Sequence, residues 1–310
     1  ILQEKLTIPK ELHDALISRI KILSGMKIDE KRVPQDGRFN FKAGDNEVDL
    51  RVSSLPTTWG EKIVLRLLKK SGGVPELTEL GLRGRGLKNL EDAILRPHGI
   101  VIICGPTGSG KTTTLYSLIS KISTPKVNIV TLEDPIEYKI PGVNQVQINP
   151  AAGLTFASGL RSFLRQDPNI ILVGEIRDKE TADLAVQAAL TGHLVFSTLH
   201  TNNASGALPR LLDMGAEPYL LASSMTAIIA QRVVRKIHDK CKEAYAPDAK
   251  IMEDMKNILD SLWPAAGDGK LYKGKGDAEC GDSGYYGRVG IFEVLPMTEK
   301  IGRLILERAA

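Results

Sequence analysis

Hydrophobic residues early in the chain recur at the spacing of a helix. Within residues 11–26, four of them follow one another at steps of three or four residues: Leu12, Leu16, Ile20 and Leu23. That period is typical of an amphipathic helix with one apolar face. We therefore predict a short helix in this segment, with these four residues on its apolar side.

The pattern then changes to alternation. In EVDLRVSSL, polar or charged residues separate Val48, Leu50 and Val52, and the runs FNFK and KIVLRLLKK flank this segment. A period of two is typical of strands with one buried face. The Gly- and Pro-containing stretch SGGVPELTELG then interrupts the pattern. We predict a small α+β domain with a mixed sheet over residues 1–72.

From residue 73 onward, short apolar runs are separated by helical stretches. The runs lie in GIVIICG, NIVTLED, IILVGEIRD and HLVFSTLHT. Continuous apolar strands suit a parallel sheet that helices cover on both faces. We predict an α/β domain with a mainly parallel sheet over residues 73–310. A change of composition around residues 241–280 predicts a helical insert that ends in a Gly- and Lys-rich loop.

Composition narrows the class of protein. With 310 residues, 42% hydrophobic and 25% charged, the chain is typical of soluble globular proteins. Its 41 Lys and Arg are scattered among 37 Asp and Glu, so charge neither demands nor excludes nucleic-acid binding. Its apolar runs fall short of the roughly 20 residues of a membrane helix, which excludes an integral membrane protein. Three cysteines and no signal peptide favour a reducing cytoplasm, and the absent initiator Met suggests a truncated or processed start.

One segment has the pattern of a phosphate-binding loop. GPTGSGKT satisfies G-x-x-x-x-G-K-[ST], follows an apolar run and precedes a helical stretch. Its backbone N–H groups and the helix N-terminus would then face phosphate oxygens. We predict that Lys111 pairs with the phosphates of ATP and that Thr112 binds Mg²⁺; a glycine-rich turn without a ligand is the alternative. The predicted nucleotide-binding residues are Gly105, Pro106, Thr107, Gly108, Ser109, Gly110, Lys111, Thr112 and Thr113.

Polar residues follow three later apolar runs. Glu133 and Asp134 follow the first, Glu175 and then Arg177 the second, and His200 the third. In an open parallel sheet, the ligand crevice lies at the carboxyl ends of the strands. A carboxylate there can polarise an attacking water or hold the water shell of Mg²⁺. His200 is either a buried, satisfied imidazole or a γ-phosphate sensor or coupling residue.

These motifs also resemble a known family. GPTGSGKTTT, TLEDPIEY, LRSFLRQDPNIILVGEIRD and TGHLVFSTLHTNNA resemble, in order and spacing, the Walker A, Asp-box, Walker B and His-box motifs of the type II secretion and type IV pilus ATPases. The resemblance extends to RIKILSGMKIDEKRVPQDGRF and LRVSSLPTTWGEKIVLRLL, and so covers nearly the whole chain. It implies a small N-terminal domain joined to a RecA-like P-loop ATPase domain.

The resemblance further implies a cytoplasmic ring motor. Six copies would assemble a pilus or pseudopilus, held at the inner membrane by a platform protein and a cytoplasmic docking protein, without nucleic acid. The insert between Cys241 and Cys280 favours the assembly and secretion branch over a retraction motor. A DNA-translocating ATPase and a nucleotide-dependent switch with negligible turnover remain as alternatives.

Particular residues carry over from the family motifs. The resemblance makes Glu133 the catalytic glutamate, Glu175 the Walker B acid and His200 the His-box residue, while His193 begins the same box. Charge on the transferring phosphoryl group needs a cation, often supplied by a neighbouring subunit. A surface ion pair is the alternative for each candidate arginine. These candidates are Arg38, Arg51, Arg66, Arg161, Arg165 and Arg177.

A possible zinc knuckle lies within the insert at about residues 238–288. His238 and Cys241 are three positions apart, as are Asp277 and Cys280, and each such pair can present two ligands to one ion. Assembly-type members often have C-x-x-C twice, so this ligand set is altered. The alternative is a direct His238–Asp277 hydrogen bond without metal.

Overall fold

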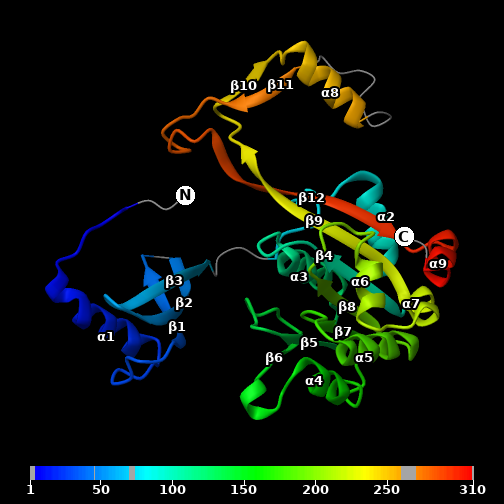
Figure 1. The fold of residues 1–310 in the computed structure, drawn as a ribbon, viewed down its shortest axis with the longest axis horizontal. Coiled ribbons are helices and arrows are strands. Elements are labelled where there is room, and N and C mark those ends of the chain that lie inside the picture. Colours follow the sequence, from blue (N-terminus) through cyan, green and yellow to red (C-terminus); the bar gives the residue numbers. More distant parts are fainter. Residues whose placement is uncertain (1–3, 45, 70–73, 260–269, 309–310) are drawn as a thin grey trace. The chain divides into compact units, whose positions relative to one another are not determined.

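The chain folds into two compact units. The computed structural model describes residues 4–44, 46–69, 74–259 and 270–308 (Figure 1). The units are Ile1–Gly73 and Val74–Ala310. The predicted boundary at about residue 72 lies outside the described residues.

The first unit combines a helix with a three-stranded sheet. After a 3₁₀ turn at Lys10–Leu12, helix α1 spans His13–Leu23. The strands β1 (Gln35–Ala43), β2 (Asn46–Thr57) and β3 (Gly60–Lys69) pair in the order β1-β2-β3. All described pairs are antiparallel, so the prediction of a mixed sheet is wrong. The short links between these strands explain this, because parallel strands need long crossover connections.

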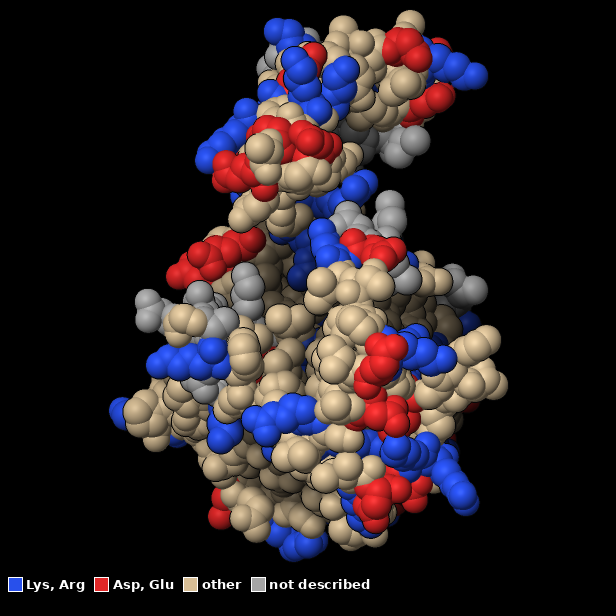
Figure 2. Space-filling model, turned by 90° about the vertical axis from the view of Figure 1, so that its left-hand side faces the viewer, with Lys and Arg blue, Asp and Glu red and all other residues tan. Residues whose placement is uncertain are grey.

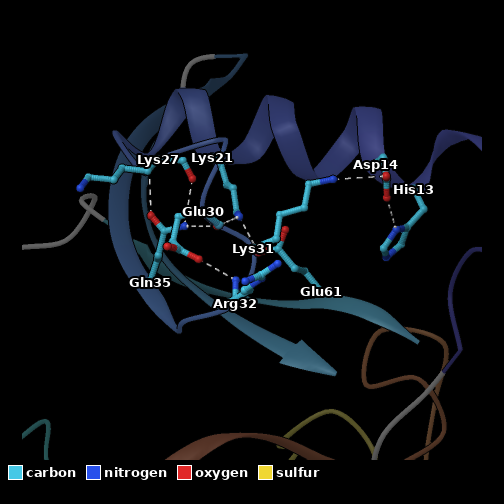
Figure 3. A network of polar contacts seen from close by, with 9 residues as sticks. All are labelled: His13, Asp14, Lys21, Lys27, Glu30, Lys31, Arg32, Gln35 and Glu61. Atoms are coloured by element: carbon cyan, nitrogen blue, oxygen red, sulfur yellow. Dashed lines mark hydrogen bonds and ion pairs between the residues drawn. The ribbon is translucent and has the colours of Figure 1, made fainter. Parts of the chain in front are cut away.

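Helix α1 buries a different side from the one that its apolar period predicts. Ile17 and Lys21 are buried, with Lys21 only 1% exposed. The Lys21 Nζ atom lies 2.5 Å from a carboxylate oxygen of Glu61 and donates to the carbonyl of Glu30 at 2.8 Å (Figure 3). A buried charge is tolerated when it is paired and hydrogen-bonded. Three residues of the predicted apolar side are exposed: Leu12, Leu16 and Leu23.

The second unit is built on a seven-stranded sheet in the order β12-β9-β4-β8-β7-β5-β6. All neighbouring strands are parallel except β12, which pairs antiparallel with β9. The predicted α/β fold with a mainly parallel sheet is therefore confirmed. In chain order, the strands are β4 (Gly99–Cys104), β5 (Ile129–Glu133), β6 (Asn144–Gln147), β7 (Ile170–Val173), β8 (Leu194–Leu199), β9 (Met225–Ile237) and β12 (Tyr285–Pro296).

Helices cover both faces of this sheet. One apolar cluster joins the sheet to α2 and α3, and a second joins it to α4, α5, α6, α7 and α9. Alternate residues of β4 enter the two clusters, Ile102 in one and Ile103 in the other. The helices are α2 (Gly84–Ile94), α3 (Lys111–Ile122), α4 (Phe156–Phe163), α5 (Lys179–Leu190), α6 (Ala207–Asp213), α7 (Pro218–Ser224) and α9 (Glu299–Leu306), with a 3₁₀ turn at Pro150–Ala152.

The insert lies beyond the ends of the long strands β9 and β12 (Figure 1). It contains β10 (Lys242–Tyr245), helix α8 (Ala249–Leu259) and β11 (Leu271–Gly274). Part of the predicted Gly- and Lys-rich loop falls at residues 260–269, outside the described residues. The prediction is wrong for residues 271–274, which form β11 because they pair with β10. None of the described helices is long and apolar enough to cross a membrane.

Candidate functional site

The glycine-rich segment forms the turn from β4 into α3. Gly105 and Gly110 have φ angles of 148° and 87°, which favour glycine. A Cβ added at Gly105 would lie 2.5 Å from the carbonyl oxygen of Gln231, and one at Gly110 would lie 2.9 Å from its Nε2 atom. Glycine is thus required both by conformation and by the close approach of β9.

Gln231 supports this loop from the neighbouring strand. It is only 3% exposed, and its Oε1 atom accepts a hydrogen bond from the hydroxyl of Thr114 at 2.8 Å. Thr114 belongs to the first turns of α3, so this bond fixes the start of the helix against β9. Gln231 is not among the residues predicted from the sequence. The only feature that could have indicated it is the position of this amide within the apolar run MTAIIAQRVV.

Lys111, the first residue of α3, turns back over the loop. Its Nζ atom donates to the carbonyl oxygens of Gly105 at 2.8 Å and Pro106 at 3.2 Å. Burial lowers the pKa of Lys111, and the negative charge of Glu175 opposes this shift. Thr112 and Thr113 are half-buried beside it. The buried Oγ atom of Ser109 has no partner among the described residues.

Glu175, Arg177 and His200 come together at the carboxyl ends of β7 and β8. A carboxylate oxygen of Glu175 lies 2.5 Å from Arg177, and the other lies 3.4 Å from Nε2 of His200. The hydrogen bond that Arg177 donates to Glu175 raises the pKa of Arg177, as does the charge of Asp134 to a smaller degree. Because β4, β5, β7 and β8 are parallel, this cluster and the loop occupy one edge of the sheet.

Glu133 ends β5, as predicted, and is almost fully buried. It is 4% exposed. It accepts hydrogen bonds from the hydroxyl of Tyr116, from Thr131 Oγ1 at 2.6 Å and from Gln145 Nε2 at 3.1 Å. Tyr116 and Gln145 are not among the residues predicted from the sequence. Each lies on a different element from Glu133, and the sequence pattern does not show which elements come together.

The other predicted residues lie in separate places. His193 precedes β8, at the opposite end of that strand from His200. Arg161 pairs with Glu180 of α5. Arg165 donates to the carbonyl of Arg161, within its own segment.

Three arginines of the first unit are in register. Arg38 of β1 pairs directly with Arg51 of β2, which pairs directly with Arg66 of β3. Directly paired residues of antiparallel strands share one face, and like charges in such positions are destabilising. Such a row of positive charge is suited to binding an anion.

The four predicted knuckle residues form one cluster in the insert. The candidate ligand atoms of His238, Cys241, Asp277 and Cys280 lie within 4.8 Å of one another. His238 Nδ1 is buried and lies 2.9 Å from an Asp277 oxygen. The cluster therefore contains the features of both predictions, namely four converging ligand atoms and a direct His238–Asp277 contact.

Comparison with known proteins assigns the chain to a family. The family model described as "Type II/IV secretion system protein" matches residues 1–310. The chain belongs to this family. It is 49% identical over 305 residues to the type II secretion system protein E of Pseudomonas aeruginosa, covering 98% of this chain and 60% of that protein. It is 48% identical over 300 residues to the type IV pilus assembly ATPase PilB of Thermus thermophilus, covering 97% of this chain and 33% of that one.

Solved structures are also similar to this member of the family. The pilus retraction motor PilT with bound ADP has a TM-score of 0.62 and 30% identity, covering 89% of this chain and 67% of that one. The ATPase DotB of Legionella pneumophila has a TM-score of 0.62 and 26% identity, covering 89% and 66%. The chain spans 60% or less of the length of the two sequence relatives described above.

Proposed function

We propose that this chain binds ATP with Mg²⁺ and hydrolyses it to drive assembly of a type IV pilus or a type II secretion pseudopilus. The observation that carries the proposal is the shared sheet edge of the loop at residues 105–112 and the Glu175–Arg177–His200 cluster. The loop fits phosphate, because space is open at Gly108 and Ser109 Oγ has no partner among the described residues.

The residues at this edge supply distinct functions. Lys111 and the loop N–H groups would hold the phosphates, and the hydroxyl of Thr112 would hold Mg²⁺, which neutralises charge on the phosphates when bound. Glu175 would orient water bound to the metal, and His200 and Arg177 orient Glu175. Glu133 would act as the general base for the attacking water.

We also propose that the functional unit is a ring of six copies in the cytoplasm. Its partners would be an inner-membrane platform protein and a cytoplasmic docking protein. The row of Arg38, Arg51 and Arg66 would contribute cations to a nucleotide held by an adjoining copy. The register of the three arginines is the observation that supports a site shared between copies.

Equilibrium titration with a fluorescent ATP analogue tests the nucleotide site. Lys111→Ala should weaken binding at least tenfold, since it removes one charge-assisted contact of about 1.5–3 kcal/mol. The matched control is Lys121→Ala on the same helix, because Lys121 pairs with Glu91 at the surface. Equal binding by wild type and Lys111→Ala contradicts the site.

DNA translocation is the alternative function, and it can be tested with the same purified protein. On the face shown in Figure 2, Lys and Arg are interspersed with Asp and Glu. A DNA motor would show ATPase stimulation by added DNA, with strong salt dependence. We expect turnover to be unchanged by DNA; a salt-sensitive stimulation would favour the alternative.

We further propose that the His238, Cys241, Asp277 and Cys280 cluster binds one zinc ion that stabilises the insert. Two thiolates, an imidazole and a carboxylate can form a tetrahedral site. The positive charge of Lys240 is compensated by Glu279 at 2.6 Å, which reduces repulsion of a cation. When bound, the ion would hold the ends of β9 and β12 together.

Elemental analysis of protein purified without added metal or chelator tests this site. We expect about one zinc per chain in the wild type, a loss of zinc in Cys241→Ser, and retention in the control Cys104→Ser. Cys104 is buried at the end of β4, away from the cluster ligands. A folded insert without zinc contradicts the proposal and leaves the nucleotide site untouched.

A further inference from the structure

The buried carboxylate of Glu133 is held by donors from three directions. Tyr116 lies on α3, Thr131 on β5 itself and Gln145 on β6. Gln145 Nε2 also donates to the carbonyl of Tyr138 at 3.1 Å, and the backbone N–H of Glu137 donates to the hydroxyl of Tyr116 at 3.2 Å. Glu133 therefore belongs to a connected polar network beneath the sheet edge.

We infer that Tyr116 and Gln145 are positioning residues that hold the Glu133 carboxylate in one place for ATP hydrolysis. The inference rests on the proposed function, which makes Glu133 the general base. A general base must have a defined position when the water attacks. The hydrogen bonds from Tyr116 and Gln145 supply that position.

The burial of Glu133 makes these donors necessary. An ionised carboxylate removed from water is strongly disfavoured unless hydrogen bonds replace its hydration. Three donors hydrogen-bond to the carboxylate here. Burial raises the pKa of Tyr116 further above its ordinary value, with the hydrogen bond to Glu133 adding to the shift, so this hydroxyl keeps its proton to donate.

Tyr116 also connects Glu133 to the phosphate-binding loop. It lies on the helix that Lys111 begins, five residues and therefore about 7.5 Å further along the axis. The same rigid helix thus holds the phosphate-binding lysine at its start and a donor to Glu133 in its second turn. The Tyr116–Glu133 hydrogen bond therefore ties the carboxylate to the helix that begins at the loop.

The chain offers a matched control in Tyr138. The rings of Tyr116 and Tyr138 meet edge-on, with centroids 4.5 Å apart. The Tyr116 hydroxyl donates to Glu133, whereas Tyr138 is joined to the network through its carbonyl, which Tyr138→Phe retains. Burial raises the pKa of Tyr138 to about 12, with the charges of Glu133 and Glu137 adding to the shift. Neither tyrosine ionises between pH 5 and 8, the range in which turnover is measured.

The test compares kcat and KM for ATP in Tyr116→Phe, Gln145→Leu and Tyr138→Phe. Loss of one donor leaves the Glu133 carboxylate less firmly positioned, so we expect kcat to fall about tenfold in the first two variants. Their KM for ATP should stay unchanged, because neither residue belongs to the phosphate-binding loop. Both parameters of Tyr138→Phe should stay at wild-type values.

The outcomes separate this inference from the proposed function. If Glu133→Gln retains full turnover, Glu133 is not the base and the proposed function of that residue fails. If Glu133→Gln is inactive but Tyr116→Phe and Gln145→Leu keep the wild-type kcat, or lose kcat and affinity for ATP together, the network is structural and only this inference fails. An equal fall of kcat in Tyr138→Phe also overturns it. Should Tyr116→Phe fold poorly, Gln145→Leu decides between these results.

Discussion

A carboxylate oxygen of Glu175 lies 3.4 Å from Nε2 of His200, although helix α5 separates the two residues in the sequence. Their strands β7 and β8 are parallel neighbours, so residues just past both strands meet at one edge of the sheet. Arg177 reaches the other oxygen of Glu175. Glu175 is thus oriented from two sides. Its negative charge also opposes the lowering of the Lys111 pKa by burial.

Glu175→Gln should separate binding from hydrolysis. The amide keeps the size of the side chain but removes the charge, so we expect kcat to fall about 100-fold while the affinity for ATP stays close to that of the wild type. Steady-state phosphate release and nucleotide titration measure the two quantities. The matched control is Glu180→Gln, at the surface of α5. Equal turnover in wild type and Glu175→Gln contradicts the assignment.

Mixed assemblies should reveal whether copies share a site. Arg51→Ala alone should lower turnover by about 10³-fold if its guanidinium acts on a neighbour's nucleotide. Mixing Arg51→Ala with Lys111→Ala should restore part of the activity, because some interfaces then contain an intact arginine and an intact loop. Lys121→Ala, which breaks a surface pair, is the control. No rescue in mixtures that demonstrably co-assemble argues against shared sites.

The first unit should depend on its buried ion pair. Lys21→Ala leaves the charge of Glu61 buried without its partner, which should lower the free energy of unfolding by about 3–5 kcal/mol. Lys31→Ala is the control, because Lys31 and Asp14 form an exposed pair at 3.5 Å (Figure 3). Urea unfolding and hydrogen exchange of β1 to β3 measure the effect. A similar loss of unfolding free energy in both variants would contradict a dependence of the first unit on the buried ion pair.

The bond between Gln231 and Thr114 should show coupling in a double-mutant cycle. Gln231→Leu leaves a buried hydroxyl without its partner and should destabilise the fold by about 1–3 kcal/mol. Adding Thr114→Val replaces the pair by apolar groups of similar shape and should recover much of that loss. Urea unfolding of the four proteins gives the coupling energy, and strictly additive effects would contradict the role of this bond.

Four strands of the second unit, β4, β5, β7 and β8, were predictable because their signal is local. Each lies in a mainly apolar run, and residues of β4 such as Ile102 and Ile103 meet helices on opposite faces of the sheet. The positions of Glu175 and His200 followed from the same rule, since parallel strands end at one edge. The antiparallel order of β1 to β3 and the strand at Leu271–Gly274 depend on pairing partners, which local pattern does not specify.

Polar residues inside regular elements were the least predictable. Lys21, Tyr116, Gln145 and Gln231 are each satisfied by a partner from another segment. A periodicity analysis treats such residues as solvent-facing, because it does not include the partner that makes burial tolerable. For this reason the predicted buried side of α1 is wrong, and the hydrogen-bond partners of Glu133 were not predicted. Which of the six arginines act on phosphate stays a prediction.

The most direct test of the account is phosphate release from ATP by the full chain with and without Mg²⁺, compared with Lys111→Ala. We predict Mg²⁺-dependent release in the wild type that saturates with ATP and falls to background in Lys111→Ala, while Lys121→Ala keeps wild-type turnover. Release at background level in the wild type, or equal release in Lys111→Ala, would contradict the claim that this sheet edge hydrolyses ATP.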